Sequence, residues 1–403
     1  MQYRRFGRTE LQMPVISTGG MRYQDGWKDK PLSEVDPAVH QNLVDTIARS
    51  IDVGINHIET ARGYGVSERQ LGTVLPGYPR DQLIVQTKIG PEDDPAVFTR
   101  NFMESLDRLQ LDYVDLLAIH GINNDQTLEQ SIRKGGCLDA ARALQKQGLC
   151  RHVGFSTHGP LRIIMAALDA DPRDALSAFD YFNVHWYYIF RRNWPAIRRA
   201  TELDMGVFII SPSDKGGKLY EPPRDWVDAC QPIHPIVFND LWCLSRPEVH
   251  TLSLGAARPS DYDLHVEAVE LMDRTEELVP PIDATLTEMM RARTGLSHPE
   301  GMNAGLPEPE DTPGGLNLEV MLWLRHLAVG WGMETYGKMR FNLLGNGGHW
   351  FPGVAVDSKD QIDQRAIAKA VDGSPYADAI PGLVEESFDR LGGEKVKRLS
   401  DSG

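Results

Sequence analysis

Residues 83–88 read Leu-Ile-Val-Gln-Thr-Lys, and this short run indicates the fold. Its apolar and β-branched residues are typical of a strand buried on both faces, as strands of parallel sheets are. Apolar residues at helical spacing follow at Phe98, Phe102, Leu106 and Leu109. A strand followed by a helix in this order predicts a parallel sheet with right-handed helical crossovers.

The same alternation continues in both directions along the chain. Asp36 followed by Pro37 predicts a helix start, and the capping-box spacing from Ser67 to Gln70 predicts another helix through Leu75. The predicted strands cover residues 14–17, 56–60, 83–88, 114–119, 152–156, 181–186, 206–211 and 251–255. Eight such units most simply close into a (β/α)8 TIM barrel. The alternative is a doubly wound open sheet, although no G-x-G-x-x-G follows the first strand.

The chain is longer than a barrel needs. It has 403 residues, whereas a barrel commonly takes about 250 residues. The alternation stops near residue 275, residues 296–315 are rich in Pro, Gly and acidic residues, and residues 318–333 have a helical pattern. We therefore predict a barrel over residues 1–275 and a mainly helical C-terminal extension over residues 276–403.

Composition excludes several classes of partner. The net charge of −15 argues against nucleic acid, because a polyanion binder needs a basic face. No segment is apolar enough for a signal peptide or a membrane span, so we expect a cytoplasmic protein without a membrane partner. The sequence predicts no oligomeric state. The four cysteines lack C-x-x-C spacing and are expected to be reduced thiols, namely Cys137, Cys150, Cys230 and Cys243.

Polar residues follow the predicted strands at the end where barrel enzymes carry their chemistry. Glu59 ends the second strand and Tyr64 follows it, Lys88 ends the third strand, and His120 ends the fourth. Taken singly, Lys88 has the alternative of a charge that extends to the barrel rim, and His120 that of a satisfied core imidazole. The convergence of all four groups at one rim favours a catalytic site.

Such a set of groups suits proton transfer to a carbonyl oxygen. Tyrosine has an ordinary pKa near 10, and a neighbouring cation lowers it. Lys88, held by Glu59, would tune Tyr64 toward the operating pH, and His120 would orient the carbonyl by hydrogen bonding. None of these groups supplies hydride, so the chemistry requires a redox cofactor.

The stretch His57-Ile58-Glu59-Thr60-Ala61-Arg62-Gly63-Tyr64-Gly65 resembles the aldo-keto reductase signature, and the resemblance extends over residues 1–272. It implies that Tyr64 is the general acid, that Lys88 and Glu59 are its tuning pair, and that His120 orients the carbonyl. It also implies an enzyme that reduces a small-molecule aldehyde or ketone. The implied cofactor is NADPH, with NADH possible, and no metal is implied.

Three further segments resemble the cofactor-binding elements of that family. The resemblance implies that the nicotinamide carboxamide is held by Ser156 and Thr157, with Asn183 in place of the usual glutamine. It assigns to the loop over the pyrophosphate Ser211, Ser213, Lys215, Gly216 and Gly217. It assigns to the segment near the adenosine phosphate Gly255, Ala256 and Arg258.

The sequence departs from the family pattern at three places. Glu59 replaces the usual aspartate, so its ion pair with Lys88 must span one more methylene. Ile210 stands where an aromatic often stacks on nicotinamide. Ser260, Asp261 and Asp263 occupy a region where many NADPH-using members carry a cation. Arg258 is then the remaining partner for a 2′-phosphate, and it alone favours NADPH over NADH.

The C-terminal region carries a second resemblance. Residues 313–318 and 336–341 look like remnants of the ferredoxin-like extension found in some aldo-keto reductases. Cluster ligation needs thiolates, and no cysteine follows Cys243, so an iron–sulfur cluster is not expected. The extension is then expected to be structural, or to shape the mouth of the substrate site.

The aromatic residues Trp186, Tyr187, Tyr188 and Trp350 are candidates for a substrate pocket. Aromatics there would favour an apolar or ring-bearing carbonyl. Ordinary packing of these side chains is the open alternative.

Two other functions fit parts of the pattern. A metal-dependent barrel hydrolase would use histidines near the strand ends, namely His57, His120, His158 and His185. A catalytically weak, nucleotide-binding redox sensor would keep the reductase fold, and the departures at Glu59 and Ile210 motivate it.

Overall fold

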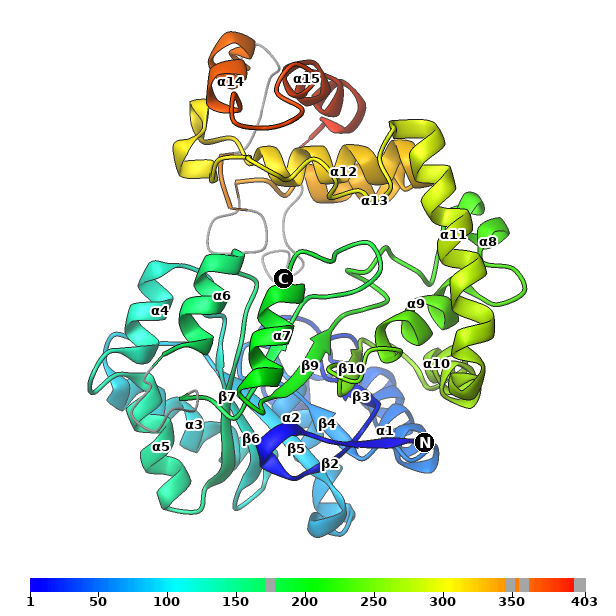
Figure 1. Cartoon of the computed structure of the whole chain (residues 1–403). Coiled ribbons are helices and arrows are strands. Elements are labelled where there is room, and N and C mark those ends of the chain that lie inside the picture. The colour runs from blue at the N-terminus through cyan, green and yellow to red at the C-terminus, as the bar shows by residue number, and fades with distance from the viewer. Residues whose placement is uncertain (171–177, 346–351, 355–361, 395–403) are drawn as a thin grey trace.

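The computed structural model describes residues 1–170, 178–345, 352–354 and 362–394, and a closed parallel barrel forms its lower half in Figure 1. The strands follow the order β10-β3-β4-β5-β6-β7-β8-β9 around the barrel. Their bounds are β3 Ile16–Gly19, β4 His57–Glu59, β5 Ile84–Ile89, β6 Val114–His120, β7 Cys150–Ser156, β8 Tyr181–Val184, β9 Gly206–Ile210 and β10 Thr251–Leu254. The predicted (β/α)8 fold is therefore confirmed.

The first barrel strand begins two residues later than predicted. Pro14 belongs instead to β2 (Gln12–Pro14), which pairs antiparallel with β1 (Tyr3–Arg5). The amide of Val15 donates to the carbonyl of Gln2, so the backbone joins the barrel only at Ile16. This hairpin carries no strong alternation of its own, which explains why sequence analysis missed it.

Ten helices of the described chain surround the barrel or connect its strands. They are α1 Pro37–Asp52, α2 Ser67–Leu71, α3 Pro95–Leu109, α4 Asp125–Ile132, α5 Cys137–Lys146, α6 Leu161–Leu168, α7 Trp194–Glu202, α8 Arg224–Ala229, α9 Pro235–Leu244 and α10 Asp263–Glu270. The Asp36 side chain accepts from the amide of Ala38, as its position before Pro37 predicts. The predicted capping box at Ser67 is wrong, because the Ser67 hydroxyl lies 2.8 Å from the Thr60 hydroxyl instead.

The barrel interior changes from apolar to polar along its axis. The apolar part joins the hairpin to the barrel wall and consists of Phe6, Met13, Ile84, Leu116, Ala118, Tyr181 and Phe208. Toward the carboxyl ends of the strands, the inward side chains include Gln86 and Asn183, whose amides lie 3.3 Å apart. Burial of the apolar part stabilises the barrel, and the polar groups available for chemistry lie toward the carboxyl ends of the strands.

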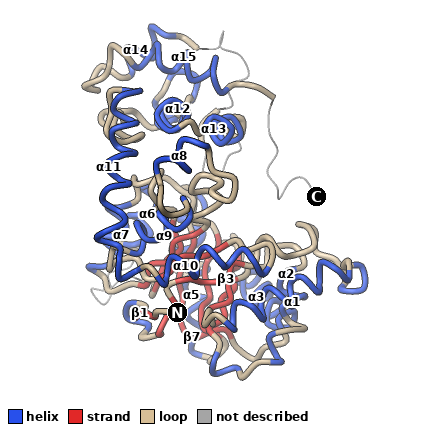
Figure 2. The backbone as a smooth tube through the Cα atoms, turned by 90° about the vertical axis from the view of Figure 1, so that its right-hand side faces the viewer, coloured by secondary structure: helices blue, strands red, loops and turns tan. Residues whose placement is uncertain are grey.

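The C-terminal extension is helical, as predicted, and stands over the mouth of the barrel (Figures 1 and 2). It contains α11 Thr275–Thr294, α12 Leu318–Trp331, α13 Glu334–Phe341, α14 Gln364–Ala370 and α15 Ile380–Leu391. In Figure 2, α11 runs upward from α10 toward the other helices of the extension. The indole of Trp323 on α12 donates to the carbonyl of Ile189 at 2.7 Å, which ties the extension to the loop after β8.

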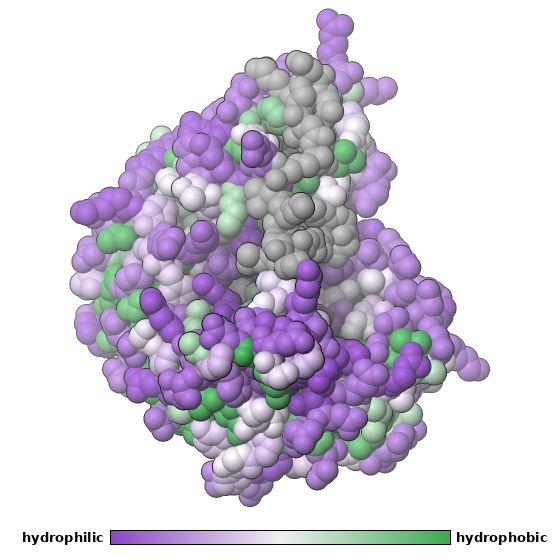
Figure 3. Space-filling view, turned by 180° about the vertical axis from the view of Figure 1, so that it is seen from behind, coloured by the Kyte–Doolittle hydropathy of each residue, from purple (hydrophilic) through white to green (hydrophobic). Residues whose placement is uncertain are grey.

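Figure 3 shows hydrophilic residues over most of one face, with apolar residues scattered among them. Within the part of the chain that the structure describes, no helix combines the length and the apolar character that a membrane span requires.

Candidate active site

Three of the predicted catalytic side chains meet at the mouth of the barrel. The Lys88 ammonium contacts Glu59 Oε1, lies 2.9 Å from the carbonyl oxygen of Thr60, and lies 3.2 Å from the hydroxyl oxygen of Tyr64. Glu59 is 3% exposed and Lys88 1% exposed, so the ion pair is shielded from water. The predicted pairing of Lys88 with Glu59 is therefore present.

The longer Glu59 side chain fits because the neighbouring strand provides space. Gly19 ends β3 beside Glu59, and a Cβ at Gly19 would lie 3.1 Å from Glu59 Oε2. It would also lie 2.8 Å from the hydroxyl of Ser253, which donates to the same carboxylate at 3.4 Å. The extra methylene of Glu59, relative to aspartate, is thus accommodated because Gly19 has no side chain. Neither Gly19 nor Ser253 was predicted to belong to the site.

The electrostatics of Tyr64 differ from expectation. Burial raises the pKa of Tyr64 well above its usual value, so the phenol holds its proton at neutral pH. The nearby ammonium of Lys88 acts in the opposite direction but does not prevail. Burial, and then the charge of Lys215, lowers the pKa of Lys88, whereas contact with Glu59 favours its charged form.

His120 lies next to Tyr64. The two rings meet edge to face with centroids 5.6 Å apart. Burial lowers the pKa of His120 to about 3, and the positive charges of Lys88 and Lys215 contribute further. The imidazole is therefore neutral at physiological pH, and one of its nitrogens is a hydrogen-bond donor.

Among the residues expected to hold a carboxamide, two have a group that can still donate a hydrogen bond. The Ser156 hydroxyl accepts from the amide of Gly121 and can still donate. Asn183 accepts from Gln86, and its Nδ2 has no partner within the described residues. Thr157 differs, because its hydroxyl donates to the carbonyl of Ile122 at 2.7 Å. Its side chain therefore holds the backbone after β6.

The loop after β9, which carries the residues predicted to cover a pyrophosphate, is compact. The amides of Lys215 and Gly216 both donate to the carbonyl of Ser211, which has a φ of 53°. Ser213 is buried, and its hydroxyl lies 3.5 Å from His265 Nε2. The charge of Lys215 contributes to lowering the pKa of both Lys88 and His120.

The predicted adenosine-phosphate segment follows β10. Gly255 is half-buried, Ala256 is buried, and Arg258 is exposed. The Arg258 guanidinium pairs with Asp261 at 3.1 Å, and its side chain is 72% exposed. The Arg258 guanidinium is accessible to a ligand in solution, but the Asp261 carboxylate offsets part of its charge.

Two further residues belong to the mouth of the barrel and were missed. Trp27, on the loop after β3, meets the Tyr64 ring edge to face with centroids 6.3 Å apart. Tyr336, on α13, donates to the carbonyl oxygen of Lys215 at 2.5 Å. Neither contact has a local sequence signal, because each joins segments that are far apart in the chain.

The histidines of the hydrolase alternative do not converge. His158 Nδ1 and His185 Nε2 lie 2.5 Å apart, whereas His57 Nδ1 lies 2.8 Å from the hydroxyl of Ser17. His120 contacts Tyr64 instead. Across the described ranges, no group of three or more His, Cys, Asp or Glu side chains is arranged to hold a metal ion.

The aromatic candidates for a substrate pocket pack into the protein interior. Trp186, Tyr187 and Tyr188 are at most 3% exposed. Trp186 stacks on Trp242 with centroids 4.5 Å apart. Packing is therefore the role of these three residues, and Trp350 lies outside the described residues.

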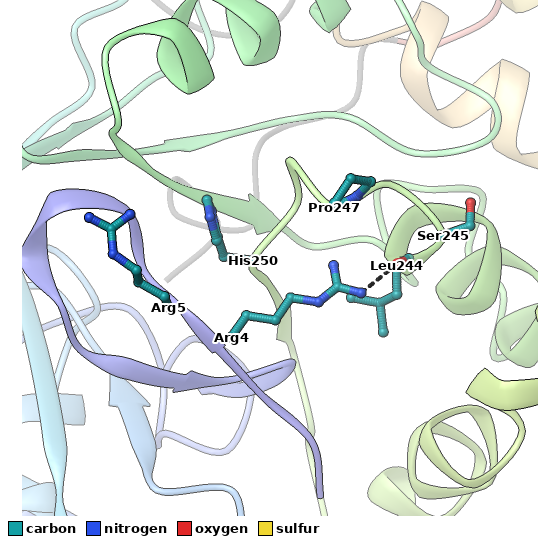
Figure 4. Close-up of a pocket in the computed structure, with 6 residues that line it drawn as sticks. All are labelled: Arg4, Arg5, Leu244, Ser245, Pro247 and His250. Carbon is teal, nitrogen blue, oxygen red and sulfur yellow. Dashed lines mark hydrogen bonds between the residues drawn. The ribbon is translucent and has the colours of Figure 1, made fainter.

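A cavity of about 380 Å³ lies at the opposite end of the barrel, between the N-terminal hairpin and the segment before β10 (Figure 4). It is lined by Arg4, Arg5, Leu244, Ser245, Pro247 and His250. Arg4 donates to the carbonyls of Leu244 at 2.6 Å and Arg246 at 3.1 Å. A cation at the carboxyl end of α9 stabilises that helix, so the residue has a structural role.

Comparison with known proteins agrees with this architecture. The model of the Aldo/keto reductase family matches residues 15–196. L-galactose dehydrogenase of Arabidopsis thaliana is 30% identical over 241 residues, which cover 54% of this chain and 70% of that protein. L-glyceraldehyde 3-phosphate reductase of Escherichia coli (strain K12) is 28% identical over 179 residues, which cover 40% of this chain and 47% of that protein. The chain thus spans only about half of the second relative.

Solved structures share the fold. An aldo-keto reductase of Bacillus halodurans in its holo form has a TM-score of 0.56 at 20% identity, covering 70% of this chain and 97% of that chain. An aldo-keto reductase of Klebsiella pneumoniae in complex with NADPH has a TM-score of 0.55 at 21% identity, covering 70% of this chain and 95% of that chain. Fold and similarity together define the class of protein as a (β/α)8-barrel oxidoreductase. The chain belongs to the aldo/keto reductase family.

Proposed function

We propose that the chain reduces an aldehyde or ketone to an alcohol, with NADPH as cofactor and NADH as the alternative. The observation that carries the proposal is the 3.2 Å approach of the Lys88 ammonium to the Tyr64 hydroxyl, beside the buried carboxylate of Glu59. A phenol, an ammonium and a neutral imidazole at one barrel mouth provide the groups that protonate a carbonyl oxygen.

In this proposal Tyr64 is the general acid. Burial keeps its phenol protonated until negative charge develops on the substrate oxygen, and the Lys88 ammonium then stabilises the phenolate that remains. His120 donates a hydrogen bond to the same oxygen from its neutral ring. Glu59 fixes Lys88 in place and is a positioning residue.

Ser156 at the end of β7, Asn183 on β8, and the loops after β9 and β10 fit a nicotinamide dinucleotide. The Asn183 Nδ2, which has no partner among the described residues, and the Ser156 hydroxyl suit a carboxamide, and the ammonium of Lys215 on the loop after β9 suits a diphosphate. Arg258 would meet a 2′-phosphate. When bound, the cofactor supplies hydride to the carbonyl carbon.

Relatives suggest where to look for the substrate. Two of the curated relatives are named for L-galactose and L-glyceraldehyde 3-phosphate, which are small hydroxylated carbonyl compounds. We propose a substrate of this class, namely a small-molecule hydroxyaldehyde or aldose. This substrate class is proposed from those relatives alone. The activity of the whole chain belongs to the same proposal.

The test starts with titration of the purified protein with NADPH and NADH, followed by tryptophan fluorescence. We expect micromolar binding of NADPH, and oxidation of NADPH when hydroxyaldehydes, aldoses and simple ketones are added. Binding without turnover across that panel would favour the redox-sensor alternative. Absence of binding to folded protein would refute the hydride-transfer mechanism, and stoichiometric zinc would favour the hydrolase.

We also propose that residues 1–275 form the barrel unit and residues 276–403 a separate extension of degenerate ferredoxin-like origin. The start of α11 at Thr275 supports this boundary. Expression of residues 1–275 alone tests it, because a barrel unit would retain cooperative unfolding.

A further inference from the structure

The loop after β9 is held by the C-terminal extension as well as by the barrel. On the barrel side, Pro212 accepts from the Asn239 side chain at 3.4 Å, and Ser213 approaches His265. On the extension side, Tyr336 donates to the carbonyl oxygen of Lys215. The second attachment joins residues 121 positions apart, so it exists only because the extension folds back over the barrel.

Tyr336 is fixed where it makes this contact. It is 3% exposed, its ring meets Trp323 edge to face with centroids 6.3 Å apart, and the Arg340 guanidinium lies 5.3 Å from its ring centre. Trp323 is itself anchored to the carbonyl of Ile189. The hydroxyl of Tyr336 is therefore presented to the loop by a rigid support.

A second contact lies two residues further along the loop. Gly217 has a φ of 128°, and a Cβ there would lie 2.6 Å from the Met333 Cε at the start of α13. Met333 is 1% exposed and thus fills the space above the glycine. Outward movement of the loop at Gly217 would require the Met333 side chain to move.

Charged side chains surround the same loop. Asp214 lies between two guanidiniums, at 3.9 Å from Arg22 on the loop after β3 and 3.8 Å from Arg340 on α13. Lys215 adds a third cation, and its charge reaches Lys88 and His120. In a chain of net charge −15, three cations around one carboxylate leave a local excess of positive charge, which favours an anionic ligand at this loop.

We propose that α13 is part of the cofactor site, with Tyr336 and Met333 as positioning residues that hold the loop after β9 over the diphosphate of a bound dinucleotide. This inference rests on the proposed function. A covered dinucleotide leaves only when the loop moves, so each contact from α13 raises the barrier to release. The extension thereby sets the dissociation rate of the cofactor.

The test compares two tyrosine variants that each lose one hydroxyl between the extension and the barrel. Tyr336→Phe removes the bond to Lys215, and Tyr188→Phe removes a 2.8 Å bond to Asp283 that joins the loop after β8 to α11. Release of NADPH is measured by stopped-flow fluorescence after displacement with excess NADP⁺. We expect release about five-fold faster in Tyr336→Phe and within two-fold of wild type in Tyr188→Phe.

Met333→Ala provides a second variant, and it should also accelerate release because it opens the space above Gly217. Unchanged release in Tyr336→Phe and Met333→Ala, with normal NADPH binding by the wild type, would overturn the inference. Equal acceleration in Tyr188→Phe would also overturn it, since the effect would then reflect general loosening. Failure of the wild type to bind either nucleotide would refute the proposed function itself.

Discussion

The Lys88 ammonium lies 3.2 Å from the Tyr64 hydroxyl and 4.6 Å from the centre of the same ring. The lysine extends from β5, whereas the tyrosine lies on the loop after β4. A buried cation against a buried phenol stabilises negative charge on the phenol oxygen. This pair is the basis of the first two predictions.

Tyr64→Phe should lower turnover with any carbonyl substrate by about 10²- to 10⁴-fold, because it removes the proposed general acid. The dissociation constant for NADPH should stay within about two-fold, since no cofactor contact is assigned to Tyr64. Steady-state kinetics and fluorescence titration check both values. Tyr181→Phe is the matched control, because its buried hydroxyl has no partner in the described chain and lies at the apolar end of the barrel. Unchanged turnover in Tyr64→Phe would remove Tyr64 from the mechanism.

Lys88→Met should abolish turnover and also lower the free energy of unfolding by about 3–5 kcal/mol, because it leaves Glu59 buried without its counter-charge. The double variant Lys88→Met with Glu59→Leu removes both charges. We expect it to regain most of the stability, as measured by urea unfolding, but none of the activity. Recovery of activity in the double variant would contradict the role assigned to Lys88.

His120→Leu should lower kcat/KM by about 10²- to 10³-fold, the usual effect of losing one donor to a developing oxyanion. His120→Gln keeps a neutral N–H donor, so it should lose less. Because burial lowers the pKa of His120 to about 3, the wild-type profile of kcat/KM should show no histidine limb between pH 5 and 8. An acidic limb near pH 6.5 that disappears in His120→Gln would contradict a neutral ring.

Arg258→Ala should weaken NADPH binding by about five- to ten-fold and leave NADH binding unchanged, because the exposed guanidinium is the proposed partner of the 2′-phosphate. Asp261→Asn is a control that should change NADPH binding in the opposite direction. It removes the carboxylate that pairs with Arg258, and we expect tighter NADPH binding. Equal loss of both nucleotides in Arg258→Ala would assign Arg258 to a structural role. Fluorescence titration of each variant with both nucleotides decides the question.

The free energy of unfolding should fall as pH decreases from 6.5 toward 4. Burial, followed by the charge of Arg325, lowers the pKa of His326 on α12 to about 4, whereas an unfolded histidine titrates near 6.5. In that window the unfolded state binds the proton and the folded state does not, so acid favours unfolding by about 1.4 kcal/mol per pH unit for this group. His326→Leu should reduce the slope by that amount in urea unfolding at several pH values. An unchanged slope would contradict the lowered pKa.

The barrel was predictable because its signal is local and repeated. Strand-like runs such as residues 83–88 alternate with helical spacing, and the second, third and fourth predicted strands carry polar residues at the same rim. The boundary error at β3 arose where Pro14 pairs with the N-terminal hairpin, which no periodic pattern marks. The capping box at Ser67 failed because a tertiary partner, Thr60, competes for its hydroxyl.

By itself, the sequence determined the barrel, the helical extension, and the order in which Glu59, Tyr64, Lys88 and His120 follow the strands, since each depends on residues close in the chain. Only the tertiary structure decided that Gly19 makes room for Glu59 and that Tyr336 holds the loop after β9. It also decided that burial, rather than the charge of Lys88, sets the direction of the Tyr64 pKa. The physical reason is that solvent exclusion and close contact depend on which distant segments pack together.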